Sequence, residues 1–287
     1  MAHRNAEPDL PANRPGGRGL SRRRTPEHLA GLVDSHAHLQ HERFDEDRDA
    51  VIDRAVASGI ERILVPGWDL ASSEAALKLA ERYAPVVHAA VGIHPHHAHE
   101  MDDESWDRLA LLAGEPLNRA IGEIGIDLFR NLSPPEVQRE AFARQLALAA
   151  EHGLAVLVHD RDAHAEVSAA LLGWNGRDGT IARGVLHAFS GDAAMARSLT
   201  DAGFVVSFAL PLAFRSAAGP RDAAPQVPDG RYLVETDAPY LGPDRERRNE
   251  PTTTLRVVTE LARLRGTDPL TLIGPIRRTY DALVGPE

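Results

Sequence analysis

Two histidines separated by a single residue, His36 and His38, have the spacing of a metal site. They lie in the segment Val33–Leu39, which begins with apolar residues and has the pattern of a β-strand. Because successive side chains of a strand point to opposite faces, both imidazoles would point the same way and could hold one metal ion. A lone His-x-His pair is weak evidence, since polar residues at a strand end are common. The ends of the other predicted strands therefore decide whether a metal site is present.

Histidines and acids also lie at the ends of later apolar segments. Each has an ordinary explanation when it is taken alone: the glycines beside Glu123 could relieve crowding in a small barrel, and Asp237 before Ala-Pro could be a turn residue. Together with the first strand, six such ends in one chain are difficult to explain by coincidence. The side chains concerned are His94, His96, Glu123, His159, His187 and Asp237.

Four imidazoles and two carboxylates suit a pair of divalent metal ions. Imidazole with oxygen ligands favours zinc or manganese, and positions filled by water would also admit magnesium. The group that bridges two cations must be anionic. Lys78 is the only lysine and lies in a predicted helix away from any strand end, so a carboxylated lysine is excluded and Glu123 is left as the bridge. At this point the candidate imidazoles are His36, His38, His94, His96, His159 and His187, and the candidate carboxylates are Glu123 and Asp237.

Such a centre indicates a hydrolase. Two cations roughly 3.5–4 Å apart activate a water molecule and stabilise negative charge on a phosphoryl or carbonyl oxygen. Asp237 could hold the attacking water and accept its proton as general base, so we predict Asp237 and Glu123 as the catalytic carboxylates. Glu235, two residues earlier on the same predicted strand face, could support Asp237 with a further hydrogen bond.

The elements that position these residues alternate regularly along the chain. Eight β-rich segments alternating with helical segments predict parallel strands joined by right-handed crossovers. The pattern favours an α/β fold, a closed (β/α)8 TIM barrel, over an open sheet, which should carry a glycine-rich loop after its first strand. Catalytic groups of such barrels lie at the C-terminal ends of the strands. The predicted strands are Leu32–Leu39, Arg62–Pro66, Val86–Ile93, Arg119–Ile126, Ala155–His159, Gly184–Phe189, Phe204–Phe208 and Tyr232–Thr236; the predicted helices are Asp45–Ser58, Leu70–Tyr83, Asp103–Ala113, Pro134–His152, Asp162–Leu172, Asp192–Ala202, Leu212–Ala218, Pro251–Arg265 and Pro269–Val284.

The composition excludes several other classes of protein. The absence of cysteine from 287 residues rules out a disulfide framework, a thiolate metal site and a cysteine nucleophile. A formal net charge of −10 is not that of a polybasic nucleic-acid binder, although divalent cations can supply local positive charge for a phosphate substrate. No apolar segment approaches the roughly 18–20 residues that span a bilayer. We expect a cytoplasmic protein with no membrane contact and no obligate protein partner.

The N-terminal stretch differs from the rest of the chain. Residues 1–30 are rich in arginine, proline and glycine and have almost no aliphatic periodicity, so we predict a disordered extension. Beyond it there is no internal repeat or long linker. We predict a single hydrolase domain over residues 31–287.

Six motifs in this order resemble one known family. They cover the chain from about Val33 to about Glu260 and include every predicted ligand. The chain closely resembles the TatD-like metal-dependent hydrolases, which are commonly described as deoxyribonucleases of the amidohydrolase superfamily. The motifs are Asp-Ser-His-Ala-His-Leu, Gly-Ile-His-Pro-His, Ile-Gly-Glu-Ile-Gly-Ile-Asp, His-Asp-Arg-Asp-Ala, Leu-His-Ala-Phe-Ser-Gly and Glu-Thr-Asp-Ala-Pro-Tyr.

The resemblance implies a role for each of these positions. One metal ion would be held by His36, His38 and Asp237, a second by His159 and His187, and Glu123 would bridge the two. His94 and His96 match a motif that lines the substrate cleft. Arg161 matches an arginine after the histidine of the fifth strand, and a guanidinium there suits a phosphate oxygen.

The resemblance and the ligands together favour a deoxyribonuclease that hydrolyses phosphodiesters at DNA ends in the manner of an exonuclease. The arginines near the predicted barrel mouth, Arg161, Arg245, Arg247 and Arg248, favour such a substrate. Two alternatives remain open. The same metal centre could hydrolyse an ester, lactone, amide or aminoacyl-RNA bond, or the barrel could be a catalytically inactive binding scaffold, which the complete ligand set argues against.

Overall fold

Eight strands line the centre of the molecule in the computed structural model, which describes residues 25–176, 182–243 and 247–285. The strands form one sheet in chain order, and every neighbouring pair is parallel. The predicted α/β barrel is therefore confirmed. The strands are β1 (Leu32–Asp34), β2 (Ile60–Pro66), β3 (Val87–Val91), β4 (Asn118–Asp127), β5 (Ala155–Arg161), β6 (Gly184–Leu186), β7 (Val205–Phe208) and β8 (Tyr232–Val234).

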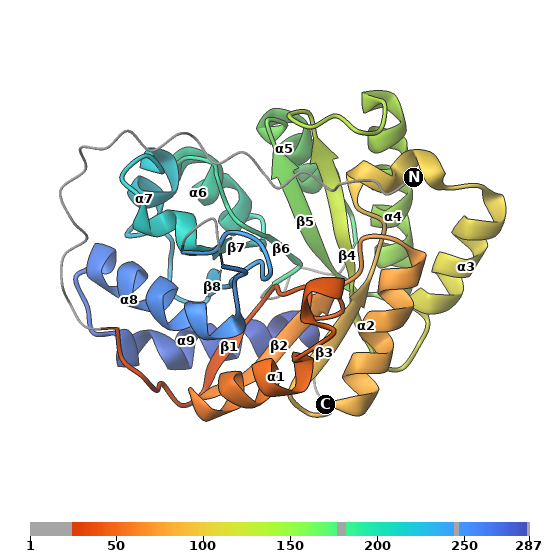
Figure 1. Cartoon of the computed structure of the whole chain (residues 1–287). Coiled ribbons are helices and arrows are strands. Elements are labelled where there is room, and N and C mark those ends of the chain that lie inside the picture. Colours follow the sequence, from red (N-terminus) through yellow and green to blue (C-terminus); the bar gives the residue numbers. More distant parts are fainter. Residues whose placement is uncertain (1–24, 177–181, 244–246, 286–287) are drawn as a thin grey trace.

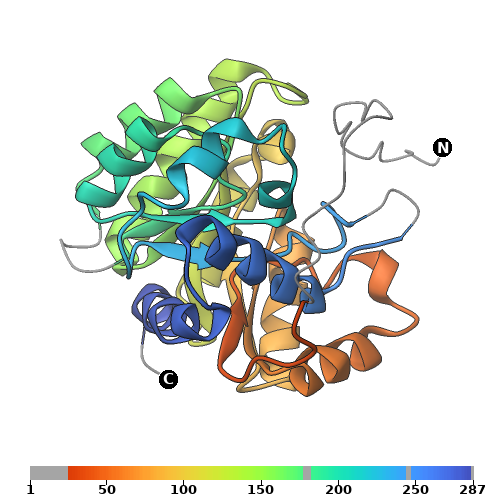
Figure 2. The same cartoon turned by 90° about the vertical axis from the view of Figure 1, so that its left-hand side faces the viewer.

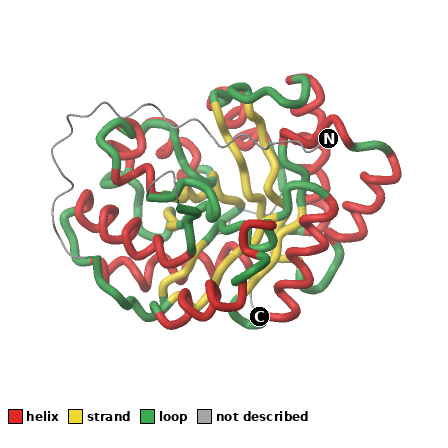
Figure 3. The backbone as a smooth tube through the Cα atoms, in the orientation of Figure 1, coloured by secondary structure: helices red, strands yellow, loops and turns green. Residues whose placement is uncertain are grey.

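Helices surround the strands and cover the outer face of the sheet (Figures 1 and 2). Figure 3 shows the same arrangement as a tube, with the strands enclosed by helices. The α-helices are α1 (Arg48–Ala57), α2 (Leu70–Arg82), α3 (Asp103–Ala113), α4 (Pro135–His152), α5 (His164–Gly173), α6 (Ala193–Asp201), α7 (Ala218–Ala223), α8 (Thr254–Arg265) and α9 (Pro269–Val284); short 3₁₀ turns cover Glu42–Phe44, Pro95–Glu100, Leu210–Ala213 and Pro251–Thr253.

The barrel closes where the chain segments after β1 and β8 meet. Within the described residues no ladder pairs β1 with β8. Backbone hydrogen bonds instead connect the segments that follow these two strands. The Asp237 amide donates to the His36 carbonyl oxygen at 2.8 Å, and the His38 amide donates to the Ala238 carbonyl oxygen at 2.7 Å. This joint, which we call the seam, is built from the segments that carry three predicted ligands.

Several strands end earlier than the sequence predicts. Strand β1 ends at Asp34 instead of Leu39, and β6 and β8 end at Leu186 and Val234. The residues that follow these strands leave the ladder, and Ala188 and Asp237 take positive φ values of 41° and 57°. The histidines after β1 are therefore on irregular backbone.

The seventh predicted helix was placed wrongly. The sequence pattern indicated Leu212–Ala218, whereas the chain forms a 3₁₀ turn at Leu210–Ala213 and then the short helix α7 from Ala218. Burial of Leu210 and Leu212 explains the apolar pattern without an α-helix.

The glycines beside Glu123 are required by close packing between strands. A Cβ atom on Gly122 would lie 2.4 Å from Cβ of Leu157 on β5. Gly125 has a φ of 141°, and a Cβ there would lie 2.0 Å from the His159 carbonyl oxygen. The crowding explanation considered for these glycines is thus correct, and it coexists with the placement of Glu123 in the barrel mouth.

The N-terminal extension lies mostly outside the described residues, which begin at residue 25. Leu29, near the end of the predicted extension, is buried in the core, and its amide donates to the Ser58 carbonyl oxygen at 2.9 Å. In the part of the chain that the structure describes, none of the helices has the length and apolar character needed to span a bilayer.

Replacement of Gly122 by alanine tests the packing of β4. The added methyl group would overlap Leu157, so we expect Gly122→Ala to lower the free energy of unfolding by about 1–3 kcal/mol. Chemical denaturation measures this change. Gly173→Ala is the matched control, because a Cβ at Gly173 meets nothing within 4 Å. Equal stability of the Gly122→Ala protein and the wild type would contradict the close approach.

Candidate metal centre

One group of side chains joins the ends of β1 and β8 to Glu123. The His36 and His38 Nε2 atoms lie 3.2 Å apart. They lie 3.3 and 3.5 Å from Glu123 Oε2, and 3.7 and 3.5 Å from Asp237 Oδ1. Both histidines and Glu123 are buried. We call these four residues group A.

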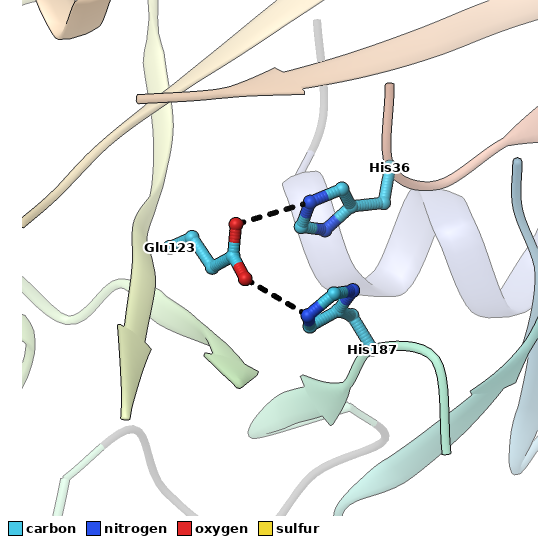
Figure 4. Close-up of side chains that lie close together, drawn as sticks. All are labelled: His36, Glu123 and His187. Carbon is cyan, nitrogen blue, oxygen red and sulfur yellow. Dashed lines mark ion pairs between the residues drawn. The ribbon is translucent and has the colours of Figure 1, made fainter. Parts of the chain in front are cut away.

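The second group surrounds the other oxygen of the same carboxylate. Glu123 Oε1 lies 2.9 Å from His187 Nε2, 3.0 Å from His159 Nδ1 and 3.4 Å from His94 Nε2. Figure 4 shows His36 and His187 pointing at opposite oxygens of Glu123. We call His94, His159, His187 and Glu123 group B. Glu123 is thus shared, and His94 lies against it.

The spacing within each group fits a small divalent cation. Four ligands about 2.0–2.1 Å from a tetrahedral ion lie about 3.3 Å from one another, by geometry. The separations between these ligand atoms run from 3.2 to 3.7 Å in group A and from 2.9 to 3.4 Å in group B. Imidazole nitrogen with carboxylate oxygen is the donor set of zinc and manganese sites. The residues therefore suit the predicted cofactors in donor type and spacing.

The carboxylates and imidazoles around Glu123 shift one another's pKa values. Burial alone would raise the pKa of the Glu123 carboxyl, but His187, His94 and His36 hold it well below its usual range. Burial likewise opposes the charge of His38, but the carboxylates of Asp237 and Glu123 raise its pKa to about 9. Burial lowers the pKa of His94 to about 3, which leaves a neutral imidazole. Cations bind anionic carboxylates and neutral imidazoles, so a metal ion in group A would have to displace the proton that the two carboxylates hold on His38.

A buried polar clasp fixes the ends of β1 and β8. Asp34 accepts hydrogen bonds from the Thr236 hydroxyl at 2.6 Å and from the Thr236 amide at 3.0 Å. The Asn249 side chain donates to the Thr236 carbonyl oxygen at 2.8 Å. The clasp holds His36 and Asp237 on either side of the seam.

Asp127 is a functional candidate that the sequence interpretation left without a role. Its Oδ2 lies 3.2 Å from His159 Nε2 and 2.8 Å from His96 Nε2, so it orients both rings. The side chain is buried. Burial opposes its charge, but hydrogen bonds from His159 and His96 hold its pKa below the usual range. The period of two from Glu123 through Gly125 to Asp127 was the signal that could have found it.

Glu235 supports a different ligand from the one predicted. We expected it beside Asp237. Instead, Glu235 Oε1 lies 3.4 Å from His187 Nδ1 and accepts a hydrogen bond from the Ala188 amide at 2.5 Å. A carboxylate behind a ligating imidazole fixes the orientation of the ring. Glu235 therefore acts on group B.

The arginines near the mouth have different surroundings. The Arg161 guanidinium lies 4.0 Å from the ring centroid of Phe129, which is 52% exposed, and among the described residues no carboxylate forms an ion pair with Arg161. Arg248 is neutralised by Asp47 at 2.5 Å and by Glu250 at 3.3 Å, which contradicts its predicted availability for phosphate. Arg245 lies outside the described residues.

An α/β barrel with two His–carboxylate groups at the C-terminal ends of its strands is the architecture of a metal-dependent hydrolase. The chain belongs to the TatD related DNase family, whose sequence model matches residues 33–279. The predicted family, barrel and hydrolase class are confirmed.

Curated relatives and solved structures agree with this assignment. The chain is 40% identical over 245 residues to the 3'-5' ssDNA/RNA exonuclease TatD of Cronobacter sakazakii, covering 83% of this chain and 92% of that protein. It is 37% identical over 236 residues to the metal-dependent hydrolase YabD of Bacillus subtilis, covering 82% and 91%. The crystal structure of YJJV, a TatD homologue from Escherichia coli K12, has a TM-score of 0.82 at 28% identity, covering 89% and 98%.

Replacement of the shared carboxylate tests both groups together. In Glu123→Gln, one oxygen becomes an NH₂ group that cannot bind a cation, and the negative charge is lost. We therefore expect the group that faces the NH₂ to lose its metal and the other group to bind metal more weakly. Turnover should fall by at least about 100-fold, because removal of a residue that only hydrogen-bonds to a metal ligand can already lower activity by about that much. Elemental analysis measures the metal content, and circular dichroism checks the fold. Glu166→Gln, at an exposed acid paired with Arg139, is the matched control. Normal turnover in Glu123→Gln would contradict the bridging role.

Proposed function

We propose that this chain is a divalent-metal-dependent exonuclease that removes nucleotides from the end of a DNA strand. The observation that carries the proposal is the shared carboxylate, with each oxygen of Glu123 facing a separate group of imidazoles. A relative that is 40% identical is named a 3'-5' ssDNA/RNA exonuclease, which supports the same substrate class.

Two divalent cations are proposed, one for each group. Group A would hold one through His36, His38 and Asp237, and group B would hold the other through His159 and His187, with Glu123 shared. His94, predicted to line the substrate cleft, is close enough to Glu123 to complete group B. A pair of such cations would activate water and stabilise charge on a phosphoryl oxygen. Zinc or manganese suits the imidazoles better than magnesium.

The residues of the chain itself bind substrate and move a proton. Burial opposes the charge of Asp237, but the His38 hydrogen bond and the nearby His187 lower its pKa, so it is ionised at neutral pH. An ionised Asp237 at the mouth accepts the proton of the attacking water. Arg161 would bind a phosphate oxygen, because its guanidinium has no ion-pair partner within the described residues. His96, whose ring is held by Asp127, is proposed as a second substrate contact.

The charge of the molecule favours strand ends over long duplex. Non-specific duplex binding uses many cationic contacts, whereas this chain has a net charge of −10 and pairs Arg248 internally. A single-stranded end needs only a few phosphate contacts near the metal centre. We therefore propose DNA ends or short single strands as the partner. The cytoplasmic location stays a prediction.

A hydrolysis screen tests the proposal. Purified protein is assayed with zinc, manganese and magnesium on 3'-labelled and 5'-labelled single-stranded DNA, aminoacyl-RNA and simple esters. We expect stepwise shortening of DNA from one end. Turnover of an ester or aminoacyl-RNA with none of DNA would overturn the nuclease proposal and retain the metal centre.

Arg161→Ala tests the phosphate contact. Loss of a charged hydrogen-bond donor should weaken oligonucleotide cleavage by about 2–3 kcal/mol, or roughly 30- to 160-fold in kcat/KM. Hydrolysis of a small neutral ester should change far less. Arg139→Ala is the control, because Arg139 pairs with Glu166 on the surface. Equal losses on both substrates, with unchanged metal content, would show that Arg161 only orients its loop.

Removal of the N-terminal extension tests the proposed domain boundary. Residues 1–24 contain no predicted ligand, so we expect a chain starting at residue 25 to keep kcat/KM within a few-fold of the full chain. The deletion stops before Leu29 because that side chain is buried. Loss of activity with an unchanged melting temperature would show that the extension contributes to the site.

A further inference from the structure

Aromatic rings adjoin group A at the barrel mouth. Trp68 follows β2, and Tyr240 follows β8. Their ring centroids lie 5.3 and 6.1 Å from the ring of His38. They also lie 5.9 and 5.7 Å from the ring of His41. Two chain segments far apart in the sequence thus bring aromatic rings to the same side of the metal centre.

Backbone hydrogen bonds fix the main chain of both aromatic residues next to the ligands. The carbonyl oxygen of Trp68 accepts a hydrogen bond from the His94 amide at 2.9 Å. The amide of Tyr240 donates to the Asp237 carbonyl oxygen at 2.8 Å. A group bound against these rings would therefore lie at a defined position beside the reacting centre.

Both residues are also partly exposed and carry hydrogen-bond donors that no described residue accepts from. Trp68 and Tyr240 are half-buried, so part of each ring faces solvent. Among the described residues, neither the Trp68 indole N–H nor the Tyr240 hydroxyl has a hydrogen-bond partner. Rings placed only to fill the core would be buried, and a buried indole N–H or hydroxyl usually finds a partner.

We propose that Trp68 and Tyr240 form a subsite in which the base of the terminal nucleotide stacks beside group A. The inference rests on the proposed exonuclease function and names the part of the substrate that the site recognises. Every nucleobase has a flat π-face, so stacking on aromatic side chains holds any base without reading its sequence. The free indole N–H and hydroxyl can donate to acceptors of the same nucleotide.

The subsite has a consequence for strand choice. A base can stack on a protein ring only when it is not paired and stacked within a duplex. The aromatic pair therefore selects unpaired ends, independently of the shortage of cationic contacts. It also distinguishes nucleotides from simple esters, which have no base to stack.

Two single-stranded oligonucleotides test the proposal, identical except that one lacks the base on the nucleotide to be removed. We expect wild-type kcat/KM to be about ten-fold higher for the substrate with the base. In Trp68→Ala this ratio should fall to within about two-fold of one. Trp68→Phe should keep most of the ratio, because the ring is retained. Trp106→Ala, which removes a half-buried indole from α3, should keep the wild-type ratio.

Three outcomes would overturn the proposal, and they can be told apart. A wild-type ratio near one, or an unchanged ratio in Trp68→Ala with normal metal content, removes the subsite and leaves the nuclease intact. An equal loss on both oligonucleotides together with reduced metal content shows that Trp68 only positions His38. Failure of the wild type to cleave either oligonucleotide with any metal overturns the proposed function, and the subsite with it.

Discussion

A buried carboxylate surrounded by imidazoles is the interaction on which the rest of this structure depends. An anion removed from water is costly unless it is paired and hydrogen-bonded. Glu123 meets that demand by placing one oxygen against the histidines after β1 and the other against His159, His187 and His94. Small residues on both sides of it let β4 approach its neighbours, because any side chain there would overlap β5.

Carboxylates behind the histidines complete this arrangement. Asp127 holds His159 from one side, and Glu235 holds His187 from the other. In both histidines, one ring nitrogen faces the supporting carboxylate and the other ring nitrogen faces Glu123. A ring fixed in this way needs little reorganisation when a cation binds, so the orientation is built into the fold.

Local features of the sequence were sufficient to predict the barrel and most of the centre. Strand and helix periodicity predicts eight alternating units, and polar residues at strand ends indicate where the ligands lie. The rest depends on contacts between residues far apart in the chain. Arg248 pairs with Asp47, 201 residues away, so its charge was not available as the sequence suggested. The early end of β1 follows from bonds between His38 and Ala238, which no local pattern reports.

The seam between the first and last strands links cation affinity to the integrity of the barrel. Short hydrogen bonds join it, and group A lies across it, with His36 and His38 on one side and Asp237 on the other. A ligand that binds only the folded chain adds RT ln(1 + [L]/Kd) to its stability, about 4 kcal/mol at 1,000 times Kd. A cation in group A would thus cross-link the segments after the first and last strands of the sheet. Loss of this ion would lower the stability of the barrel and remove the chemistry of the site together, so the concentration of free metal would affect the fold as well as the activity.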